Sequence, residues 1–207
     1  MKTGQLKIKG YCSISNNRVI LNDTLLMEDP GSDFSTFLKL AYKKMVTNYP
    51  KFFKMDDLSK LGFLAADILL KPMIRDSEMS KNIALVFSNS ASSLQTDRKH
   101  QESITDRENY FPSPAVFVYT LPNICLGEIS IKHRLYSENS FFIFNHFNVA
   151  YLHDYAMGLI TTEKADEVLC GWVNCDTDDY EAFLYLVSTE GNIEHHKEEI
   201  IKLYTTK

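Results

Sequence analysis

The stretch FFIFNHFNVAYLHDYAMG, from Phe141 to Gly158, is the part of the sequence that best indicates the fold. Its apolar run, Phe141 to Phe144, predicts a buried strand of an α/β sheet. An amphipathic helix is predicted to follow, with apolar residues at Val149, Leu152, Ala156, Leu159 and Ile160. The corner between strand and helix holds Asn145, His146 and Phe147, and many enzymes present a nucleophile at such a corner. The first question is therefore whether His146 is a catalytic group.

Strands and helices alternate along the rest of the chain. Apolar runs predict further strands at residues 6–14, 83–87, 168–173 and 180–188. Apolar residues at helical spacing predict helices over 34–45 and 58–69, and a short amphipathic helix within 192–204. The pattern indicates an α/β fold with a layered mixed sheet that includes the strands at 83–87, 141–144 and 168–173, and helices on both faces. The length of 207 residues favours a single domain, 1–207.

Three segments of the sequence show no clear helix or strand pattern. Residues 16–30 are rich in turn-forming side chains, and SNSASSLQTDRKHQESI, residues 88–104, is a polar stretch after a predicted strand. The segment FPSPAVFVYTLPNICLGEISIKH, residues 111–133, is ambiguous, because Val116 and Val118 alternate as in a strand while Pro122 interrupts the pattern.

Composition and charge exclude several classes of protein. The chain is 44% hydrophobic with a net charge of −5 and contains no run of five basic residues, which argues against a nucleic-acid-binding protein. No apolar run reaches the roughly 18 to 20 residues that span a bilayer, and residues 1–15 lack the apolar core of a secretory signal. We therefore expect a cytoplasmic protein without nucleic-acid or membrane partners.

The four cysteines are expected to be free thiols. Cys12, Cys125, Cys170 and Cys175 lie in apolar surroundings and do not have the spacing of a disulfide framework. The CGWVNC segment lacks the spacing of a zinc knuckle, so core packing is favoured over metal binding.

Several segments, in order and spacing, resemble the N-terminal half of a β-ketoacyl-acyl carrier protein synthase of the thiolase-like superfamily. They are NIALVFSNSASSLQTD, LPNICLGEISIKHRLYSENSFFIF and EVLCGWVN, including the Pro122-Asn123 and Glu138-Asn139 pairs, Gly127 and the ISI of Ile129 to Ile131. The resemblance covers most of the chain and implies a thiolase-like half as the fold.

The resemblance also implies that the nucleophile is missing. In this family the corresponding corner carries a cysteine whose thiol pKa is lowered by the following helix and which accepts the acyl group. The cysteine position falls on His146, with Asn145 at the preceding alanine position and Asn148 or Val149 at the small-residue positions. The family's second half, which supplies two His or a His and an Asn, has no counterpart in this sequence. His195 and His196 are not expected to replace them, because they lie on the C-terminal amphipathic helix among solvated Glu and Lys side chains.

A catalytic role and a metal-binding role of His146 are compared with a purely structural role. His146 could act as a general base, but a structural, buried imidazole satisfied by Asn145 or by backbone groups is favoured. A metal site of His146, His153 and Asp154 is excluded by spacing, since residues seven apart on a helix are about 10 Å apart.

Two polar runs also have simple interpretations. The hydroxyl run Ser88 to Ser93 lacks the spacing of a nucleophile elbow and is read as a polar loop or cap. Asp176, Asp178 and Asp179 lack the remaining ligands of a calcium loop and are read as a solvated turn.

The resemblance also implies an interface. In the resembled family the strand before the nucleophile pairs with its equivalent in a second subunit, so Phe141, Phe142 and Phe144 are interface candidates, although a plain core strand is an equal alternative.

The sequence supports two functional hypotheses. The first hypothesis is a non-catalytic subunit of fatty-acid, polyketide or aryl-polyene biosynthesis. It would pair with itself or with a complete ketosynthase, with acyl carrier protein as a further candidate partner. The second hypothesis is an independent acyl-thioester-acting enzyme with a remodelled pocket around His146. Neither requires a metal or a cofactor.

Overall fold

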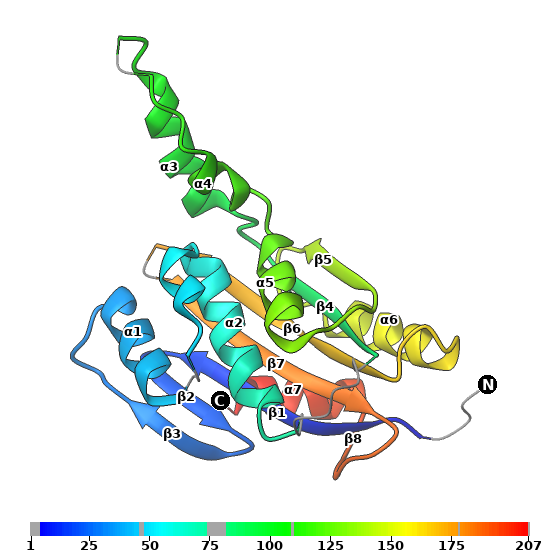
Figure 1. The fold of residues 1–207 in the computed structure, drawn as a ribbon. Helices are drawn as coiled ribbons and strands as arrows, with labels where there is room; N and C mark the ends of the chain where they lie inside the picture. Colours follow the sequence, from blue (N-terminus) through cyan, green and yellow to red (C-terminus); the bar gives the residue numbers. More distant parts are fainter. Residues whose placement is uncertain (1–4, 46–47, 74–81, 109, 178, 207) are drawn as a thin grey trace.

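A mixed sheet of eight strands forms the centre of the molecule in the computed structural model, which describes residues 5–45, 48–73, 82–108, 110–177 and 179–206 (Figure 1). Seven strands follow the order β3-β2-β1-β7-β6-β4-β5, and the short β8 pairs with β1. The strands are β1 (Lys7–Ser15), β2 (Arg18–Leu21), β3 (Thr24–Glu28), β4 (Ile83–Asn89), β5 (Asn139–Ile143), β6 (Glu167–Asp176), β7 (Asp179–Ser188) and β8 (Ile193–Glu194).

The three strands expected to share the sheet do so. β5, β4 and β6 run parallel, and β6, β7, β1, β2 and β3 continue the sheet in antiparallel fashion. Every residue of β4 is buried, as its continuous apolar run predicted. β5 differs: it is the last strand on the ordered path, at the edge of the sheet, and its residues are half-buried or exposed.

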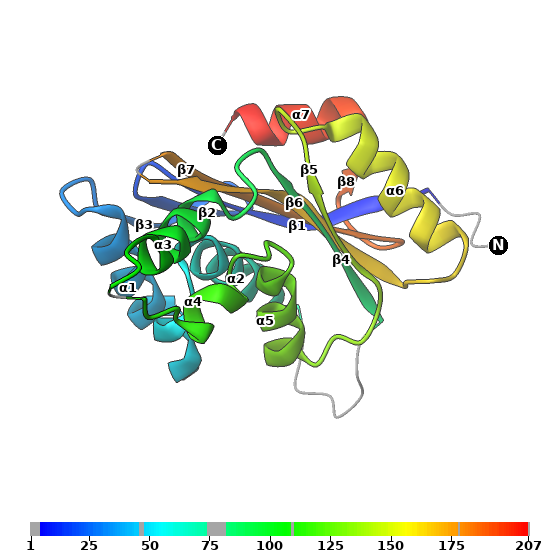
Figure 2. The same cartoon turned by 90° about the horizontal axis from the view of Figure 1, so that it is seen from above.

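Helices cover both faces of the sheet, as predicted (Figure 2). α1, α2 and α5 pack with one face into one hydrophobic core, and α6 and α7 pack with the other face into a second. The helices are α1 (Phe34–Met45), α2 (Asp57–Leu70), α3 (Leu94–Thr105), α4 (Pro114–Val118), α5 (Ile124–His133), α6 (Val149–Thr161) and α7 (Lys197–Thr205), with a 3-10 turn η1 (Pro50–Lys54). In the described ranges, none of these helices has the length and apolarity needed to cross a membrane.

Aspartate side chains cap the first two helices. The Asp33 carboxylate accepts a hydrogen bond from the Thr36 amide at 2.9 Å, and Asp56 accepts one from the Ser59 amide at 2.9 Å. These bonds satisfy N–H groups that the first helical turn leaves without a partner. Twelve of the fourteen residues of α2 are buried, so this helix lies at the centre of the first core.

The turn-rich segment after β1 forms a hairpin that the sequence interpretation missed. Asn16 and Asn17 connect β1 to β2, and Asn22 and Asp23 connect β2 to β3, all four with positive φ. Two successive residues with positive φ form the tight turn whose twist matches paired strands, and Asn and Asp tolerate this conformation. The turn residues therefore continue the sheet instead of leaving it.

The two remaining ambiguous segments are helical. The polar stretch after β4 contains α3, and the segment of mixed pattern contains α4 and α5. α3 and α4 project together from the body of the molecule (Figure 1). Thr96 is the buried residue of α3, and α4 has none, so neither helix contributes apolar side chains to a core.

The C-terminal segment departs from the prediction of one amphipathic helix. Residues 193–194 form β8 beside β1, and α7 begins only at Lys197. His195 therefore precedes the helix, and it is 5% exposed rather than solvated. Ile200, Leu203 and Tyr204 of α7 pack into the second core, where Ile200 is buried, whereas Ile201 is 49% exposed.

Candidate functional site

The corner between β5 and α6 is built where the sequence placed it. The Phe144 amide donates to the Asn89 carbonyl at 2.9 Å, which keeps the chain beside β4 after β5 has ended. Asn148 precedes α6, and its side-chain oxygen accepts a hydrogen bond from the Tyr151 amide at 3.1 Å. The corner thus spans Asn145 to Asn148 between the sheet edge and a capped helix.

His146 is exposed at this corner, so the expectation of a buried imidazole was wrong. The buried residue is the next one, Phe147. Its ring lies 4.8 Å from that of Tyr204, 5.8 Å from Phe183 and 6.2 Å from Trp172, measured between centroids. Phe147 fixes the corner to the second core, and the adjacent exposed residues Asn145 and His146 are presented to solvent.

The start of α6 determines what the corner can do chemically. The N-terminus of a helix offers free N–H groups and a partial positive charge that stabilise an anion. Here the Asn148 side chain occupies the Tyr151 N–H. A neutral amide cap therefore uses part of the site at which a helix would otherwise stabilise a thiolate.

None of the four cysteines lies at the corner. Cys12, Cys125, Cys170 and Cys175 are free and buried, as expected. Burial is the main cause that raises the pKa of each thiol, because a buried thiolate would lose its hydration. Thiols of this kind are poor nucleophiles.

The three interface candidates of β5 do not face the same way. Phe141 packs against the first core, whereas Phe142 and Phe144 pack against the second. Phe142 lies between Tyr151 at 4.8 Å and Tyr155 at 5.2 Å, and Phe144 lies 5.1 Å from Tyr151. All three phenylalanines are half-buried inside the chain, and the exposed apolar side chain of β5 is Ile143, which is 50% exposed.

His153 is engaged away from the corner. Its Nδ1 lies 2.7 Å from an Asp154 oxygen, and its Nε2 lies 3.0 Å from the His195 carbonyl. The His195 ring stacks on His153, and burial is the main cause that lowers the pKa of His195 to about 3. Within the described ranges, no group of three or more His, Cys, Asp or Glu side chains could hold a metal ion.

The two polar runs have structural partners. The Ser88 hydroxyl is buried and donates to the Gly171 carbonyl, and the Ser93 hydroxyl donates to the Thr120 carbonyl at 2.6 Å. Asp176 forms an ion pair with Arg98, and Asp179 is the exposed first residue of β7. Asp178 lies outside the described residues.

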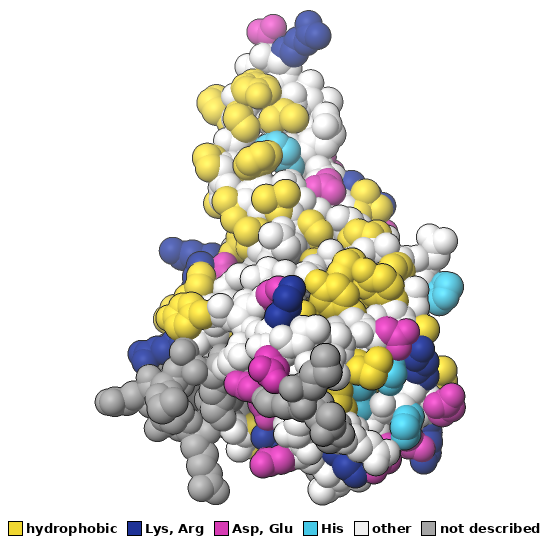
Figure 3. Space-filling view, turned by 90° about the vertical axis from the view of Figure 1, so that its right-hand side faces the viewer, with side chains coloured by type: hydrophobic (Ala, Val, Ile, Leu, Met, Phe, Trp, Pro, Cys, Tyr) yellow, Lys and Arg dark blue, Asp and Glu magenta, His cyan; other side chains and the backbone are white. Residues whose placement is uncertain are grey.

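One surface was not identified from the sequence. The projecting helices expose large hydrophobic side chains, and Figure 3 shows hydrophobic side chains over this projection and again on the body below it. The signal was present in FPSPAVFVYTLP, whose apolar residues were read as an ambiguous strand. The exposed residues are Leu94, Tyr110, Phe111, Phe117, Val118 and Leu121.

This chain is similar to known proteins in structure, but no similarity is found in sequence. No family model matches the sequence, and no curated protein does. The fold is similar to the ishigamide ketosynthase/chain length factor, with a TM-score of 0.62 and 17% identity over 89% of this chain. It is equally similar, with a TM-score of 0.62 and 11% identity over 98% of this chain, to the complex of ketosynthase ApeO with its chain length factor ApeC from Xenorhabdus doucetiae. A β-ketoacyl synthase from Burkholderia phymatum gives 0.59 at 10% identity over 97% of this chain.

The matched chains differ in length. This chain spans 62% of the ishigamide chain and 61% of the Burkholderia chain, but 91% of the matched chain in the Xenorhabdus complex. That matched chain is therefore similar in length to this protein. At these identities the likeness establishes the fold, and the chain has the thiolase-like fold of ketosynthases and chain length factors.

Proposed function

We propose that this protein is a non-catalytic, ketosynthase-like subunit that acts as a single domain and pairs with a complete ketosynthase. The pathway would be fatty-acid, polyketide or aryl-polyene biosynthesis in the cytoplasm, with acyl carrier protein as a further partner. The observation that carries the proposal is the β5–α6 corner, where an exposed His146 stands beside an amide-capped helix at the edge of the sheet.

The chemistry of the corner supports a non-catalytic role. Ketosynthase acyl transfer needs a thiolate that attacks a thioester and holds the acyl group as a new thioester. The cysteines of this chain are buried, and their raised pKa values keep them as thiols at neutral pH. His146 at the exposed position could not form the thioester that the reaction requires.

The position of β5 at the edge of the sheet supports pairing with a strand of a second chain. One side of β5 pairs with β4, and within the described residues no strand pairs with its other side. An edge strand leaves alternate N–H and C=O groups without strand partners, and natural proteins cover or pair such edges. The exposed Ile143 adds apolar area at the end of this edge.

The similar length of the Xenorhabdus chain also supports a partner role. The match covers nearly all of both chains, and the complex contains a ketosynthase with its chain length factor. The fold is therefore compatible with assembly beside another ketosynthase-fold chain. Self-pairing through β5 is the simpler form of the same interface.

A binding experiment tests the partner role. Each complete ketosynthase encoded in the same genome would be purified and mixed with this chain, and the mass of the complex measured by light scattering after gel filtration. Ile143→Asp should abolish the complex, because a charge would lie unpaired in the paired edge. Ile201→Asp, at a similarly exposed position on α7, is the matched control and should bind normally. Absence of any complex with wild-type protein would contradict the proposal.

An acylation experiment tests the non-catalytic role separately. The chain would be incubated with acyl and malonyl thioesters and analysed by intact-mass spectrometry and by thioester consumption. We expect no acyl adduct and no turnover. A stoichiometric adduct on any cysteine, or hydrolysis that is lost in His146→Ala, would favour the independent enzyme instead.

A further inference from the structure

The projecting part of the chain is a rigid platform rather than a loose loop. We call residues 94–108 and 110–121, which contain α3 and α4, the arm. Ring contact between His100 and Phe117, with centroids 5.3 Å apart, joins its two helices. The Phe111 amide donates to the Ser103 carbonyl at 3.3 Å and closes the described part of the connection between them.

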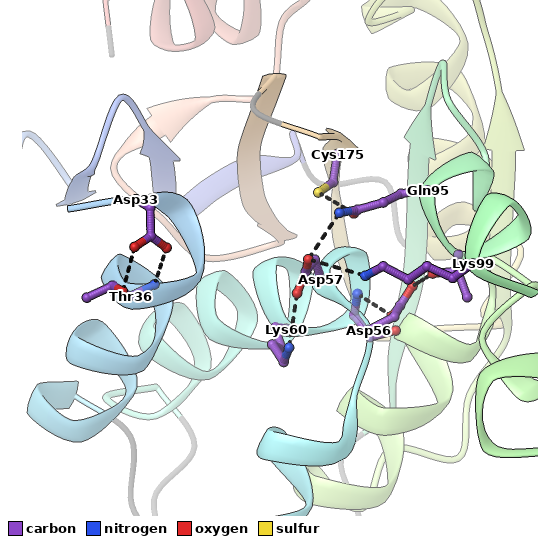
Figure 4. Close-up of polar contacts among 10 residues, drawn as sticks. Asp33, Thr36, Asp56, Asp57, Lys60, Gln95, Lys99 and Cys175 are labelled. Atoms are coloured by element: carbon purple, nitrogen blue, oxygen red, sulfur yellow. Dashed lines mark hydrogen bonds and ion pairs between the residues drawn. The ribbon is translucent and has the colours of Figure 1, made fainter. Parts of the chain in front are cut away.

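Polar contacts fix the base of the arm to the body (Figure 4). The Thr96 hydroxyl donates to Asp56 at 2.9 Å, and the Gln95 amide donates to Asp57 at 3.2 Å. Asp56 also caps α2, so the same carboxylate orients both the central helix and the arm. We call these four residues the joint. Because their contacts are directional, they hold the arm at a defined angle.

Further bonds support the joint from the neighbouring elements. Arg98 on α3 forms an ion pair with Asp176 at the end of β6. At the other end of the arm, the Tyr119 hydroxyl donates to the buried Glu128 carboxylate of α5 at 3.0 Å. The arm is therefore attached to α2, α5 and the sheet by polar groups and by the Tyr119 ring, which is buried in the first core, whereas most of its large apolar side chains are exposed.

The arm exposes large aromatic and aliphatic side chains. Phe111 is 75% exposed and Phe117 is 57% exposed, and Leu121 and Tyr110 are also more than half exposed. Single exposed hydrophobic residues are common, but aromatic residues gathered on a fixed projection are typical of interfaces. Figure 3 shows hydrophobic side chains over the projection and over part of the body beneath it.

The arm is continuous with the free edge of β5. Asn89, the last residue of β4, is in register with Ile143, the last residue of β5, and α3 begins five positions later at Leu94. A partner strand that paired along β5 would reach Ile143 beside the base of the arm. One partner can therefore contact both surfaces.

We propose that the arm is a second contact surface for the complete ketosynthase that pairs with β5, with Phe111 and Phe117 as its anchoring side chains. This inference rests on the proposed function, and it assigns the arm to the same partner. The rigid joint means that the anchors are already positioned, so the partner orders few side chains on binding. Aromatic residues at fixed positions are among those that contribute most of the binding energy at an interface.

The test compares arm variants with edge variants against the same purified ketosynthase. Phe111→Ser with Phe117→Ser should weaken binding at least about tenfold in titration calorimetry, because hot-spot aromatic residues each cost more than 1 kcal/mol when truncated. The control Ile201→Ser, on α7 and 49% exposed, should leave affinity unchanged. Circular dichroism and the thermal midpoint would verify that the arm variants fold.

The outcomes separate this inference from the one on which it rests. If wild-type protein binds and the arm variant binds equally well, the arm inference is overturned and the partner role stands. If wild-type protein binds no ketosynthase, both are overturned. If instead the chain alone is a dimer that the arm variant dissociates, the occupant is a second copy and the assignment to a ketosynthase is wrong.

Discussion

The body and the arm of this protein are stabilised by different interactions. In the body, α2 has twelve buried residues of fourteen and lies against a sheet whose central strand β4 is wholly buried. In the arm, α3 buries only Thr96 and α4 buries nothing. The body is thus held by hydrophobic burial within the chain, whereas the arm is held mainly by polar bonds at its base, with Tyr119 as its buried ring, and exposes most of its large apolar residues. The difference means that burial within the chain is concentrated in the body, whereas the exposed apolar residues of the arm are available for the contact proposed above.

The comparison is tested most strongly by truncating one aromatic residue in each region. Phe63 on α2 is completely buried, and Phe63→Ala should lower the free energy of unfolding by about 3–5 kcal/mol through lost burial and a cavity. Phe111→Ala on the arm, at a side chain that is 75% exposed, should change it by no more than about 0.5 kcal/mol. Urea unfolding followed by the fluorescence of Trp172, the single tryptophan, measures both. Similar losses in the two variants would contradict the distinction.

A pH titration tests the body alone. Burial lowers the pKa of His195 to about 3 from its ordinary value of 6.5. Between these values the unfolded chain binds a proton that the folded chain does not, so stability falls as the pH drops below 6.5. The slope contributed is at most about 1.4 kcal/mol per pH unit, or about 2 kcal/mol between pH 7 and 5. Urea titrations of wild type and His195→Leu should show a shallower dependence in the variant, and equal slopes would argue against the buried neutral imidazole.

The joint is tested by a smaller change. Thr96→Val keeps the volume of the side chain but removes its hydrogen bond to Asp56, which should cost about 1 kcal/mol. Hydrogen exchange should accelerate in α3 and α4 and stay unchanged in β4 and β6, because the joint orients the arm without supporting the sheet. Thr105→Val, at the exposed far end of α3, is the matched control. Accelerated exchange throughout the sheet would show that the arm and the body unfold as one unit.

The parts of the fold that follow from burial could be predicted from the sequence. The continuous apolar run of β4 and the helical spacing around Leu61 and Leu69 each follow from packing against a core, and both elements are present. The arm could not be found in this way, because a helix that buries only Thr96 has no apolar stripe. The hairpin was missed although Asn16 and Asn17 carry the appropriate turn signal.

The strand-to-helix corner was predicted in position but not in detail. The corner with His146 was located because strand and helix patterns meet there, yet the direction of each side chain depends on distant partners. Phe147 is buried by Trp172, Phe183 and Tyr204, which are far away in the sequence, and so His146 faces solvent. His195 was expected among solvated charges, but pairing of β8 with β1 buries it. Contacts of long sequence separation decide these outcomes, and no local pattern contains them.

The pairing of β1 with β7 and β8 has a consequence during protein synthesis. Lys7 and Glu194 form an ion pair although they are 187 residues apart, and β1 lies inside the sheet between β2 and β7. At about 5–20 residues per second, a ribosome takes roughly ten seconds or more to make the residues that separate β1 from its partners. During that time β1 can form a sheet only with β2 and β3, and the apolar residues of α2 that pack on β6 and β7 have no partner. We expect the nascent chain to bind molecular chaperones until β7 emerges.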